Sequence, residues 1–248
     1  MIPAIELSRL SKHYGPVRAL NGISMTVEQG EIVGFLGPNG AGKTTTIRIL
    51  LDLIRPTSGS AAVLGFDCQT QSLDARERMG YLPGDVRLYD NLTGREMLEY
   101  FARLRERRPD PGFVARLLER LEFDPTRRVG AYSKGNRQKL GLILAMMHRP
   151  QVLLLDEPTS GLDPLVQDRV ADLLFELAGD GATVFFSSHV LSEVERMCHR
   201  AAFLREGTLI AIEEVAAVRA RSLHIIEVVF DEPPPATAFR ISGVRETR

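Results

Sequence analysis

The most informative stretch of this 248-residue chain reads Gly37-Pro38-Asn39-Gly40-Ala41-Gly42-Lys43-Thr44. It fits the pattern GxxxxGK[ST], in which glycines allow backbone N–H groups to approach phosphate oxygens closely. The apolar run Ile32–Leu36 precedes it, and helical spacing from Gly42 to about Leu53 follows it. Because strand, loop and helix are the context that the motif requires, phosphate binding is favoured over a glycine-rich turn without function.

Each part of this loop has an expected role. A helix that starts near Gly42 directs its positive end at the phosphates, and Lys43 adds a compact charge for the β- and γ-phosphates. The Thr44 hydroxyl can bind Mg²⁺, and Thr45 extends the helix start. Only four of the 31 basic residues are lysines, which makes Lys43 conspicuous. The expected nucleotide ligands are Gly37, Pro38, Asn39, Gly40, Ala41, Gly42, Lys43, Thr44 and Thr45.

Two acids follow a second apolar run, Val152–Leu155. Asp156 and Glu157 would lie at the carboxyl edge of a sheet, where open α/β sheets bind ligands. Asp156 is placed to hold Mg²⁺ through water, which leaves Glu157 to polarise an attacking water. Without the phosphate loop, two acids that cap a strand end would be a reasonable alternative.

A histidine follows a third apolar run, Thr183–Phe186. Taken alone, His189 is more often a satisfied polar residue than a catalytic one. At the end of a neighbouring strand it could donate to the γ-phosphate and stabilise charge that develops during transfer.

Composition excludes several classes of protein. A formal net charge of −1 gives no basic field for nucleic acid, so no nucleic-acid partner is expected. The longest apolar stretch, Leu140 to Met147, is far short of the ~20 residues of a membrane-spanning helix, and the N-terminus lacks the features of a secretory signal. Cys68 and Cys198 form no metal motif and are expected to be reduced. These features predict a location in the cytoplasm.

Helices are expected between the strands, which indicates an α/β chain. Thr93-Gly94-Arg95-Glu96 has capping-box spacing and predicts a helix over about 93–107, whose arginine-rich end fits a solvated face better than a lipid contact. From there to about Met147 the sequence reads as helical, with no convincing strand. Asp163-Pro164 supplies a cap and a first-turn proline for a helix that reaches about Ala178.

These residues together resemble the ATP-binding cassette (ABC) family. Tyr132-Ser133-Lys134-Gly135-Asn136 resembles the family's signature loop, and Ser160-Gly161-Leu162-Asp163 resembles its D-loop. His189 resembles the switch histidine, and Tyr14 the aromatic residue that stacks on adenine. No other P-loop family combines these features, and the resemblance spans about residues 4 to 220.

The resemblance implies a P-loop NTPase of the ABC ATPase type, with a helical subdomain and an antiparallel β subdomain. Residues 1–222 would form the nucleotide-binding domain, with the helical subdomain at about 86–149, and 223–248 would begin a C-terminal extension. Glu157, His189 and Lys43 are the implied catalytic residues, and Thr44 and Asp156 the implied Mg²⁺ ligands. Further implied ATP ligands are Tyr14, Ser133, Gly135 and Asp163.

The resemblance also implies partners. Two cassettes would bury two ATP between them and drive a separate transmembrane permease from the cytoplasmic face of the membrane. The stretch Tyr81–Tyr89, with Leu92–Glu96, most resembles cassettes of bacterial drug and antibiotic export. The permease is expected to contact the surface near Val86–Leu92. The cargo, the permease and the choice between homodimer and heterodimer stay open.

Three departures from the family pattern leave room for other functions. Gly84 stands where the family has a glutamine that helps to hold Mg²⁺, and Asp85 is a candidate substitute. Lys134 and Asn136 replace a glycine and a glutamine of the signature loop. The segment beyond Ser222 lies outside the core cassette. The alternatives are a non-transport cassette acting on DNA, chromosomes or ribosomes, and a regulatory module that binds ATP without turnover.

Overall fold

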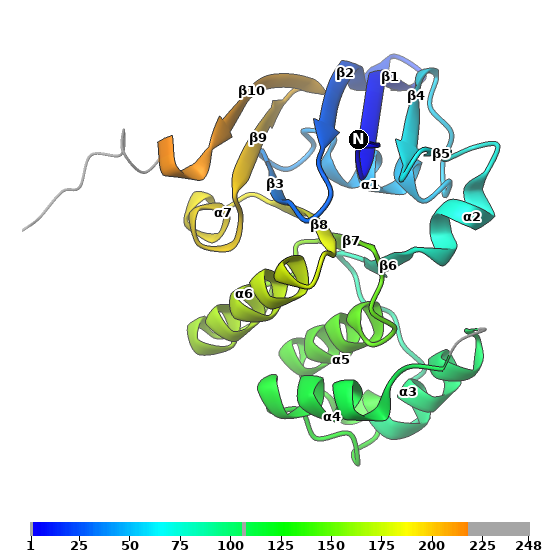
Figure 1. Cartoon of the computed structure of the whole chain (residues 1–248), viewed down its shortest axis with the longest axis vertical. Coiled ribbons are helices and arrows are strands. Elements are labelled where there is room, and N and C mark those ends of the chain that lie inside the picture. Colours follow the sequence, from blue (N-terminus) through cyan, green and yellow to red (C-terminus); the bar gives the residue numbers. More distant parts are fainter. Residues whose placement is uncertain (1, 106–107, 218–248) are drawn as a thin grey trace, which may run out of the picture.

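A computed structural model describes residues 2–105 and 108–217 (Figure 1). The strands are β1 Ile5–Tyr14, β2 Val17–Val27, β3 Ile32–Leu36, β4 Ser58–Val63, β5 Phe66–Asp67, β6 Met79–Leu82, β7 Val152–Asp156, β8 Thr183–Ser188, β9 Arg200–Arg205 and β10 Thr208–Glu214. The α-helices are α1 Lys43–Leu50, α2 Ser72–Glu77, α3 Gly94–Arg103, α4 Pro111–Arg120, α5 Lys134–Met146, α6 Pro164–Gly179 and α7 Leu191–Met197. A short 3₁₀ helix, η1 Val129–Ala131, precedes α5.

The central sheet has the strand order β10-β9-β3-β8-β7-β6. Its pairs are parallel except for β9 with β10. Alternate residues of β3 enter different cores: Ile32 faces the core shared with α5 and α6, whereas Val33 and Phe35 face the core shared with α1. A strand covered on both faces must be apolar throughout, which explains the continuous hydrophobic runs in the sequence.

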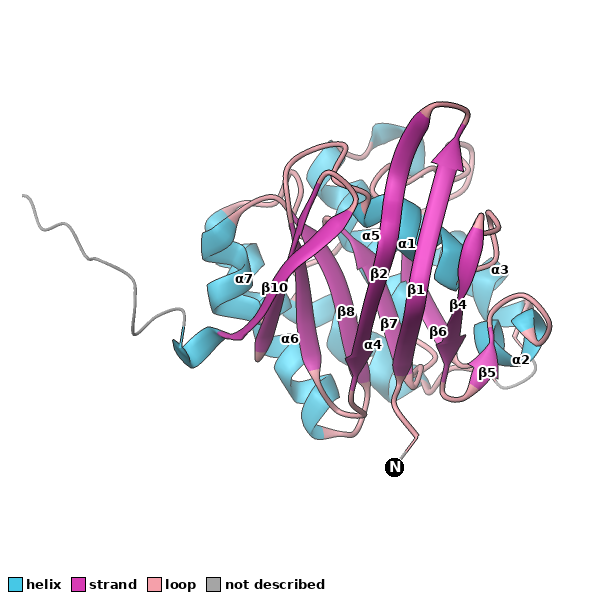
Figure 2. Ribbon diagram, turned by 90° about the horizontal axis from the view of Figure 1, so that it is seen from above, coloured by secondary structure: helices cyan, strands magenta, loops and turns pink. Residues whose placement is uncertain are grey.

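A second, antiparallel sheet has the order β2-β1-β4-β5. Seen from above, β2, β1 and β4 lie side by side with α1 behind them (Figure 2). The mostly β-branched and apolar segment Ile23–Val27 is the second half of β2. Its alternating buried and exposed residues are typical of a sheet that has one solvated face.

Helices α3, α4 and α5 form the lower part of the molecule in Figure 1. Between β6 and β7 the described residues form helices and no strand. Thr93 and Glu96 make the predicted capping box at the start of α3. The boundaries proposed for a helical subdomain, about 86–149, stay a prediction.

Two helices are shorter than predicted. The first, α1, ends at Leu50 because Asp52 takes a left-handed backbone conformation, with φ 53°, that cannot continue a right-handed helix. α3 ends at Arg103, and Leu104 is 64% exposed, so no packing extends the helix. The predicted end at 107 lies outside the described residues, as does the predicted C-terminal extension, 223–248.

The two cysteines are buried and form no disulfide with each other. Burial raises the pKa of the Cys68 thiol to about 12, so Cys68 is an unreactive packed thiol. None of the helices in the described ranges has the length and apolar character needed to cross a membrane.

Candidate nucleotide-binding site

Three strands of the central sheet deliver the predicted site residues to one edge. β8 pairs with β3 at Leu36 and Ser188 and with β7 at Asp156 and Ser187, so the three strands end side by side. The phosphate loop follows β3, the two acids end or follow β7, and His189 follows β8. The carboxyl edge of a parallel sheet is the place where open α/β folds bind ligands.

Glycine is needed at several positions of the phosphate loop, for different structural reasons. A Cβ on Gly37 would lie 2.2 Å from the carbonyl oxygen of Leu204, and one on Gly42 would lie 2.5 Å from that of Ala19. A Cβ on Gly40, where φ is 80°, would meet nothing within 4 Å. We expected these glycines to let the backbone approach phosphate oxygens. Gly37 and Gly42 also make room for the backbone that supports the loop.

Lys43 is held inside the loop. Its side chain is buried, and Nζ donates hydrogen bonds to the carbonyl oxygens of Gly37 at 2.6 Å and Pro38 at 3.0 Å. Burial lowers the pKa of Lys43, against the opposing charges of Glu157 and Asp156. The ammonium group therefore lies where phosphate oxygens could replace the two carbonyls as its partners.

Thr44, Asp156 and Ser187 form a linked group of oxygen atoms. Thr44 Oγ1 donates to Asp156 Oδ2 at 2.8 Å, and Ser187 Oγ donates to Asp156 Oδ1 at 2.5 Å. Hydroxyl and carboxylate oxygens are hard donors of the kind that suit Mg²⁺, which proteins bind through one or two carboxylates together with substrate phosphates. No cluster of three or more His, Cys, Asp or Glu ligands occurs within the described residues. The oxygens of Thr44 and Asp156 fit Mg²⁺ that enters with a nucleotide.

Glu157 and His189 face each other beside this group. His189 Nδ1 lies 3.0 Å from Glu157 Oε1, and both side chains are partly exposed. The backbone of Glu157 has φ 51°, an uncommon conformation for a residue with a side chain. Ser187 supports this turn, because its hydroxyl and carbonyl oxygens accept from Glu157 N at 3.1 and 3.2 Å.

The signature loop forms the start of α5. Ser133 caps the helix by accepting a hydrogen bond from Asn136 N at 3.2 Å. Lys134 turns toward the D-loop, where Nζ donates to Ser160 Oγ at 3.1 Å. A Cβ on Gly135 would lie 2.8 Å from the carbonyl oxygen of Gly161. The signature loop and the D-loop are therefore packed together within one chain.

Comparison with known proteins accounts for these motifs. The sequence pattern of the family described as ABC transporter matches residues 20–160. The chain belongs to the ABC transporter family. The cassette is 40% identical over 210 residues to YdbJ, an uncharacterized ABC transporter ATP-binding protein of Bacillus subtilis, covering 84% of this chain and 68% of that protein. It is 38% identical to the bacitracin transport ATP-binding protein BcrA of Bacillus licheniformis, covering 87% and 70%.

Solved structures share the fold. The ATP-binding subunit of an ABC transporter superposes with a TM-score of 0.78 at 30% identity, covering 88% of this cassette and 92% of that chain. A dimeric cassette in a post-hydrolysis state with ADP and Pi gives 0.77 at 23% identity, covering 85% and 98%, which shows the fold alone. The predicted ABC ATPase fold is confirmed, and the cassette is an ATP-binding ATPase subunit.

Other predicted ligands of the cassette come from elements that do not adjoin the phosphate loop in the sequence. Tyr14 is at the end of β1, 46% exposed, with Lys12 Nζ 5.0 Å from its ring centre. Asp163 caps α6 by accepting from Val166 N at 3.0 Å. Throughout the described ranges, no hydrogen bond, ion pair or ring contact joins Tyr14, Ser133 or Asp163 to the loop.

Gly84 of the cassette lies against Asp156. A Cβ at Gly84 would come 3.2 Å from Asp156 Oδ2, so a side chain here would press on the carboxylate. The suggested substitute, Asp85, is 76% exposed at its side chain and accepts from Arg87 Nε at 2.9 Å. Asp85 therefore has a surface partner in this structure.

Sequence reasoning missed two polar residues of the cassette that contact loops of the site. Gln138 on α5 is 3% exposed, and its Nε2 donates to the carbonyl oxygens of Glu157 and Pro158, each at 3.0 Å. Glu193 on α7 contacts two loops of the site through its carboxylate. For Gln138, the available sequence signal was a glutamine among the apolar residues of α5. No sequence pattern predicts which groups it contacts.

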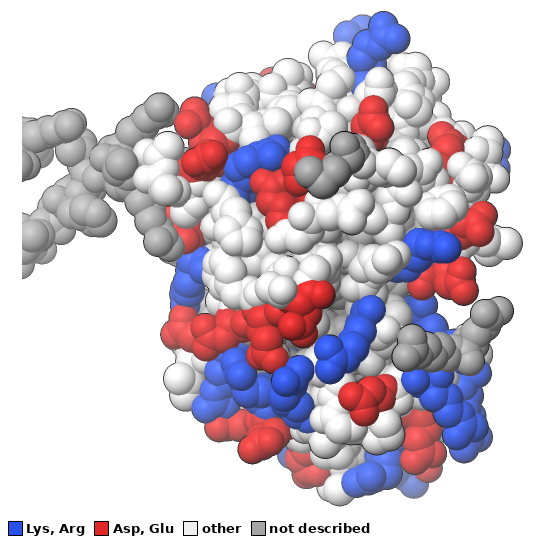
Figure 3. All heavy atoms as spheres, viewed as in Figure 1, with Lys and Arg blue, Asp and Glu red and all other residues white. Residues whose placement is uncertain are grey.

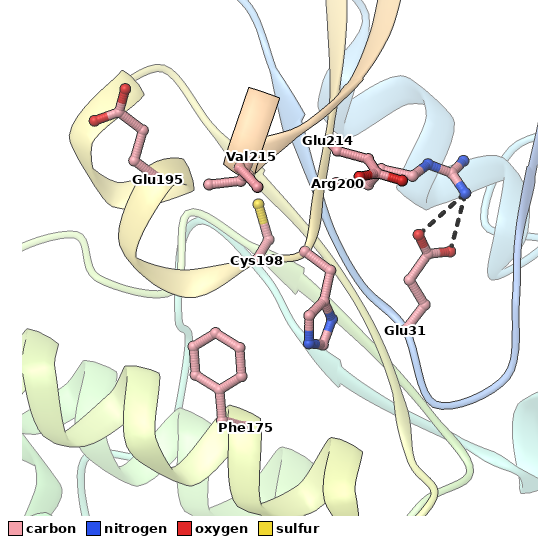
Figure 4. A pocket seen from close by; sticks show the side chains of 9 residues that line it. Glu31, Phe175, Glu195, Cys198, Arg200, Glu214 and Val215 are labelled. Carbon is pink, nitrogen blue, oxygen red and sulfur yellow. Dashed lines mark hydrogen bonds and ion pairs between the residues drawn. The ribbon is translucent and has the colours of Figure 1, made fainter. Parts of the chain in front are cut away.

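A pocket near α7, drawn in Figure 4, has a volume of about 400 Å³. The ion pair between Glu31 and Arg200, with an N–O distance of 3.0 Å, lies on one side of it, and Phe175 and Cys198 on others. None of its lining residues belongs to the predicted nucleotide site.

Proposed function

We propose that this cassette is the motor of an exporter, which dimerises around two ATP molecules and drives a separate transmembrane permease. The observation that carries the proposal is the pair of Glu157 and His189, 3.0 Å apart, beside the Thr44–Asp156 contact at the phosphate loop. An ATP-binding module without turnover has no use for such a pair. The relatives named bacitracin transport and Nod factor export ATP-binding proteins support the direction of transport.

ATP would bind with its phosphates in the loop from Gly37 to Thr45. Lys43 would exchange its two carbonyl partners for β- and γ-phosphate oxygens, so that its charge is balanced by the nucleotide. The N-terminus of α1 would direct its N–H groups at the same oxygens. Tyr14, exposed at the end of β1, would stack on the adenine.

Thr44 and Asp156 would hold Mg²⁺, directly and through water. When bound, Mg²⁺ neutralises charge that develops on the phosphate oxygens. Ser187 keeps Asp156 oriented, because it donates to Oδ1 and leaves Oδ2 toward Thr44. Gly84 would leave the space beside Asp156 Oδ2 to water.

Hydrolysis would use Glu157 and His189 as a pair. Glu157 would accept a proton from water as the water oxygen bonds to the γ-phosphorus. The bond from that phosphorus to the bridging oxygen breaks, and ADP leaves with the electron pair. His189, whose Nδ1 lies 3.0 Å from Glu157 Oε1, would donate a ring N–H to a γ-phosphate oxygen.

A second cassette would complete each site. Ser133 and Gly135 at the N-terminus of α5 would contact the γ-phosphate held by the partner, since a helix start binds anions. Asp163, in the D-loop beside this helix, would lie at the same interface. Closing of the dimer around ATP would reorient the permease, and hydrolysis would reopen the dimer.

The permease would contact the surface at residues 86–92, on the cytoplasmic face of the membrane. Tyr89 in this segment is 54% exposed and packs edge-on against Tyr100, which offers a rigid apolar contact. Basic and acidic side chains are intermixed on the face shown in Figure 3, with no continuous basic stripe there for a nucleic acid.

The first test compares ATP hydrolysis by the full chain and by Glu157→Gln, with light scattering in the presence and absence of ATP. We expect the wild type to turn over and Glu157→Gln to be inactive and trapped with ATP as a dimer. A wild type that binds ATP but neither hydrolyses it nor dimerises, even with a permease supplied, would contradict the motor proposal. That result would favour the regulatory module.

A further inference from the structure

The carboxylate of Glu193 joins two loops of the site. Glu193 lies in the first turn of α7, and its Oε1 accepts a hydrogen bond from Thr159 Oγ1 at 2.6 Å. Its Oε2 accepts one from Ser188 Oγ at 2.5 Å. Both donor residues are buried, 2% and 1% exposed, so water cannot readily take the place of the carboxylate. Breaking these hydrogen bonds would remove the carboxylate acceptor from two buried hydroxyl groups.

Both donors are close in sequence to the groups that would react. Ser188 precedes His189, and its hydroxyl also accepts from Val190 N at 3.0 Å, so the backbone is held on both sides of the histidine. Thr159 follows Glu157 by two residues in the loop between β7 and α6. One side chain from α7 therefore anchors the loop of the histidine and the loop of the glutamate.

A purely structural role for Glu193 would be to stabilise the start of α7. An acid in the first turn of a helix interacts favourably with the helix dipole. In the described part of the chain, however, the hydrogen bonds to Glu193 come from side-chain hydroxyls of two other segments rather than from N–H groups of α7. The geometry favours a tie between loops over a helix cap.

We infer that Glu193 is a positioning residue for ATP hydrolysis. By holding Ser188 and Thr159, it fixes the positions of His189 and Glu157 relative to each other. The inference rests on the proposed function, because it takes Glu157 and His189 as the reacting pair. Loss of the tie lets the two loops shift separately, and small misplacements of reacting groups are costly in rate. Phosphate binding by Lys43 and the loop does not depend on it.

The test is steady-state ATP hydrolysis by the full chain carrying Thr159→Val or Glu193→Ala. We expect kcat to fall roughly tenfold in each variant, with KM for ATP within about twofold of wild type. Thr159→Ser keeps the hydroxyl and should retain the wild-type kcat. The double variant Thr159→Val with Glu193→Ala should be no slower than Glu193→Ala, because both changes remove the same tie.

Glu195→Ala is the matched control, since it removes an acid from the same helix at the pocket of Figure 4. Thermal unfolding of every variant distinguishes a change in the positions of the reacting groups from a loss of stability of the fold. If Thr159→Val lowers the melting temperature but keeps the wild-type kcat, Glu193 is structural and the inference is overturned. Because Thr159→Val is nearly isosteric, it answers the question even if Glu193→Ala does not fold.

Glu157→Gln, measured in parallel, distinguishes a failure of the proposed function from a failure of the role inferred for Glu193. Wild-type turnover by Glu157→Gln would overturn the proposed function, and this inference with it. Loss of turnover in Glu157→Gln, together with an unchanged kcat in Thr159→Val, would overturn the role of Glu193 alone.

Discussion

A substitution at Gly37 tests whether the phosphate loop depends on close packing against the neighbouring backbone of Leu204. The variant Gly37→Ala places a methyl group 2.2 Å from the Leu204 carbonyl oxygen, so the loop or β9 must move. We expect a loss of unfolding free energy of about 3 kcal/mol, at the upper end of the usual range for overpacked sites, and weaker ATP binding. Urea unfolding measures the first effect and nucleotide titration the second.

Gly40→Ala is the matched control within the same loop. Its Cβ would have open space, and the cost comes only from a positive φ of 80°, about 1–2 kcal/mol. Equal destabilisation by the two variants would contradict the view that Gly37 is glycine because of packing against Leu204.

At the level of the element, α5 is joined to the loop after β7 by Gln138. Replacing Gln138 with Leu keeps its approximate size but leaves the carbonyl oxygens of Glu157 and Pro158 buried without this donor. We expect a loss of about 1–3 kcal/mol in unfolding free energy and a lower kcat, because the same loop carries Glu157. Gln167→Leu, which removes a single bond to the Leu162 carbonyl oxygen, is the control and should have the smaller effect. A larger loss in Gln167→Leu would refute this assignment.

At the level of the whole molecule, one partly buried histidine lowers the stability of the fold in acid. Burial, assisted by Arg105, lowers the pKa of His148 from 6.5 to about 4, and its Nδ1 has no hydrogen-bond partner in the described structure. As pH falls below 6.5, the unfolded chain takes up this proton while the folded chain does not. We therefore expect the unfolding free energy to fall by about 2 kcal/mol from this group between pH 7 and pH 5.

The measurement is urea unfolding at both pH values for the wild type and His148→Gln. The variant should lose less stability on acidification than the wild type. His13→Gln, at an exposed position, is the control and should follow the wild type. An identical pH dependence in His148→Gln would exclude this histidine as the cause.

Much of the fold was predictable from local sequence. The runs Ile32–Leu36 and Val152–Leu155 predicted buried strands because parallel strands covered on both faces have no polar side, and the capping box of Thr93 and Glu96 predicted the start of α3. The length of α1 was not predictable, because the left-handed turn at Asp52 has no local signal. The assignment of β2 to a separate sheet depended on pairing with β1, which is a tertiary contact.

The sequence by itself determined the family and the candidate ligands, since Lys43, Asp156 and His189 stand in short motifs whose spacing is local. Only the tertiary structure decided what supports them. Thr159 meets Glu193 across 34 positions and Ser187 meets Asp156 across 31, and each pair comes together because β7 and β8 lie side by side. A hydrogen bond depends on distance in space, and separations of this size carry no periodicity that a single sequence can reveal.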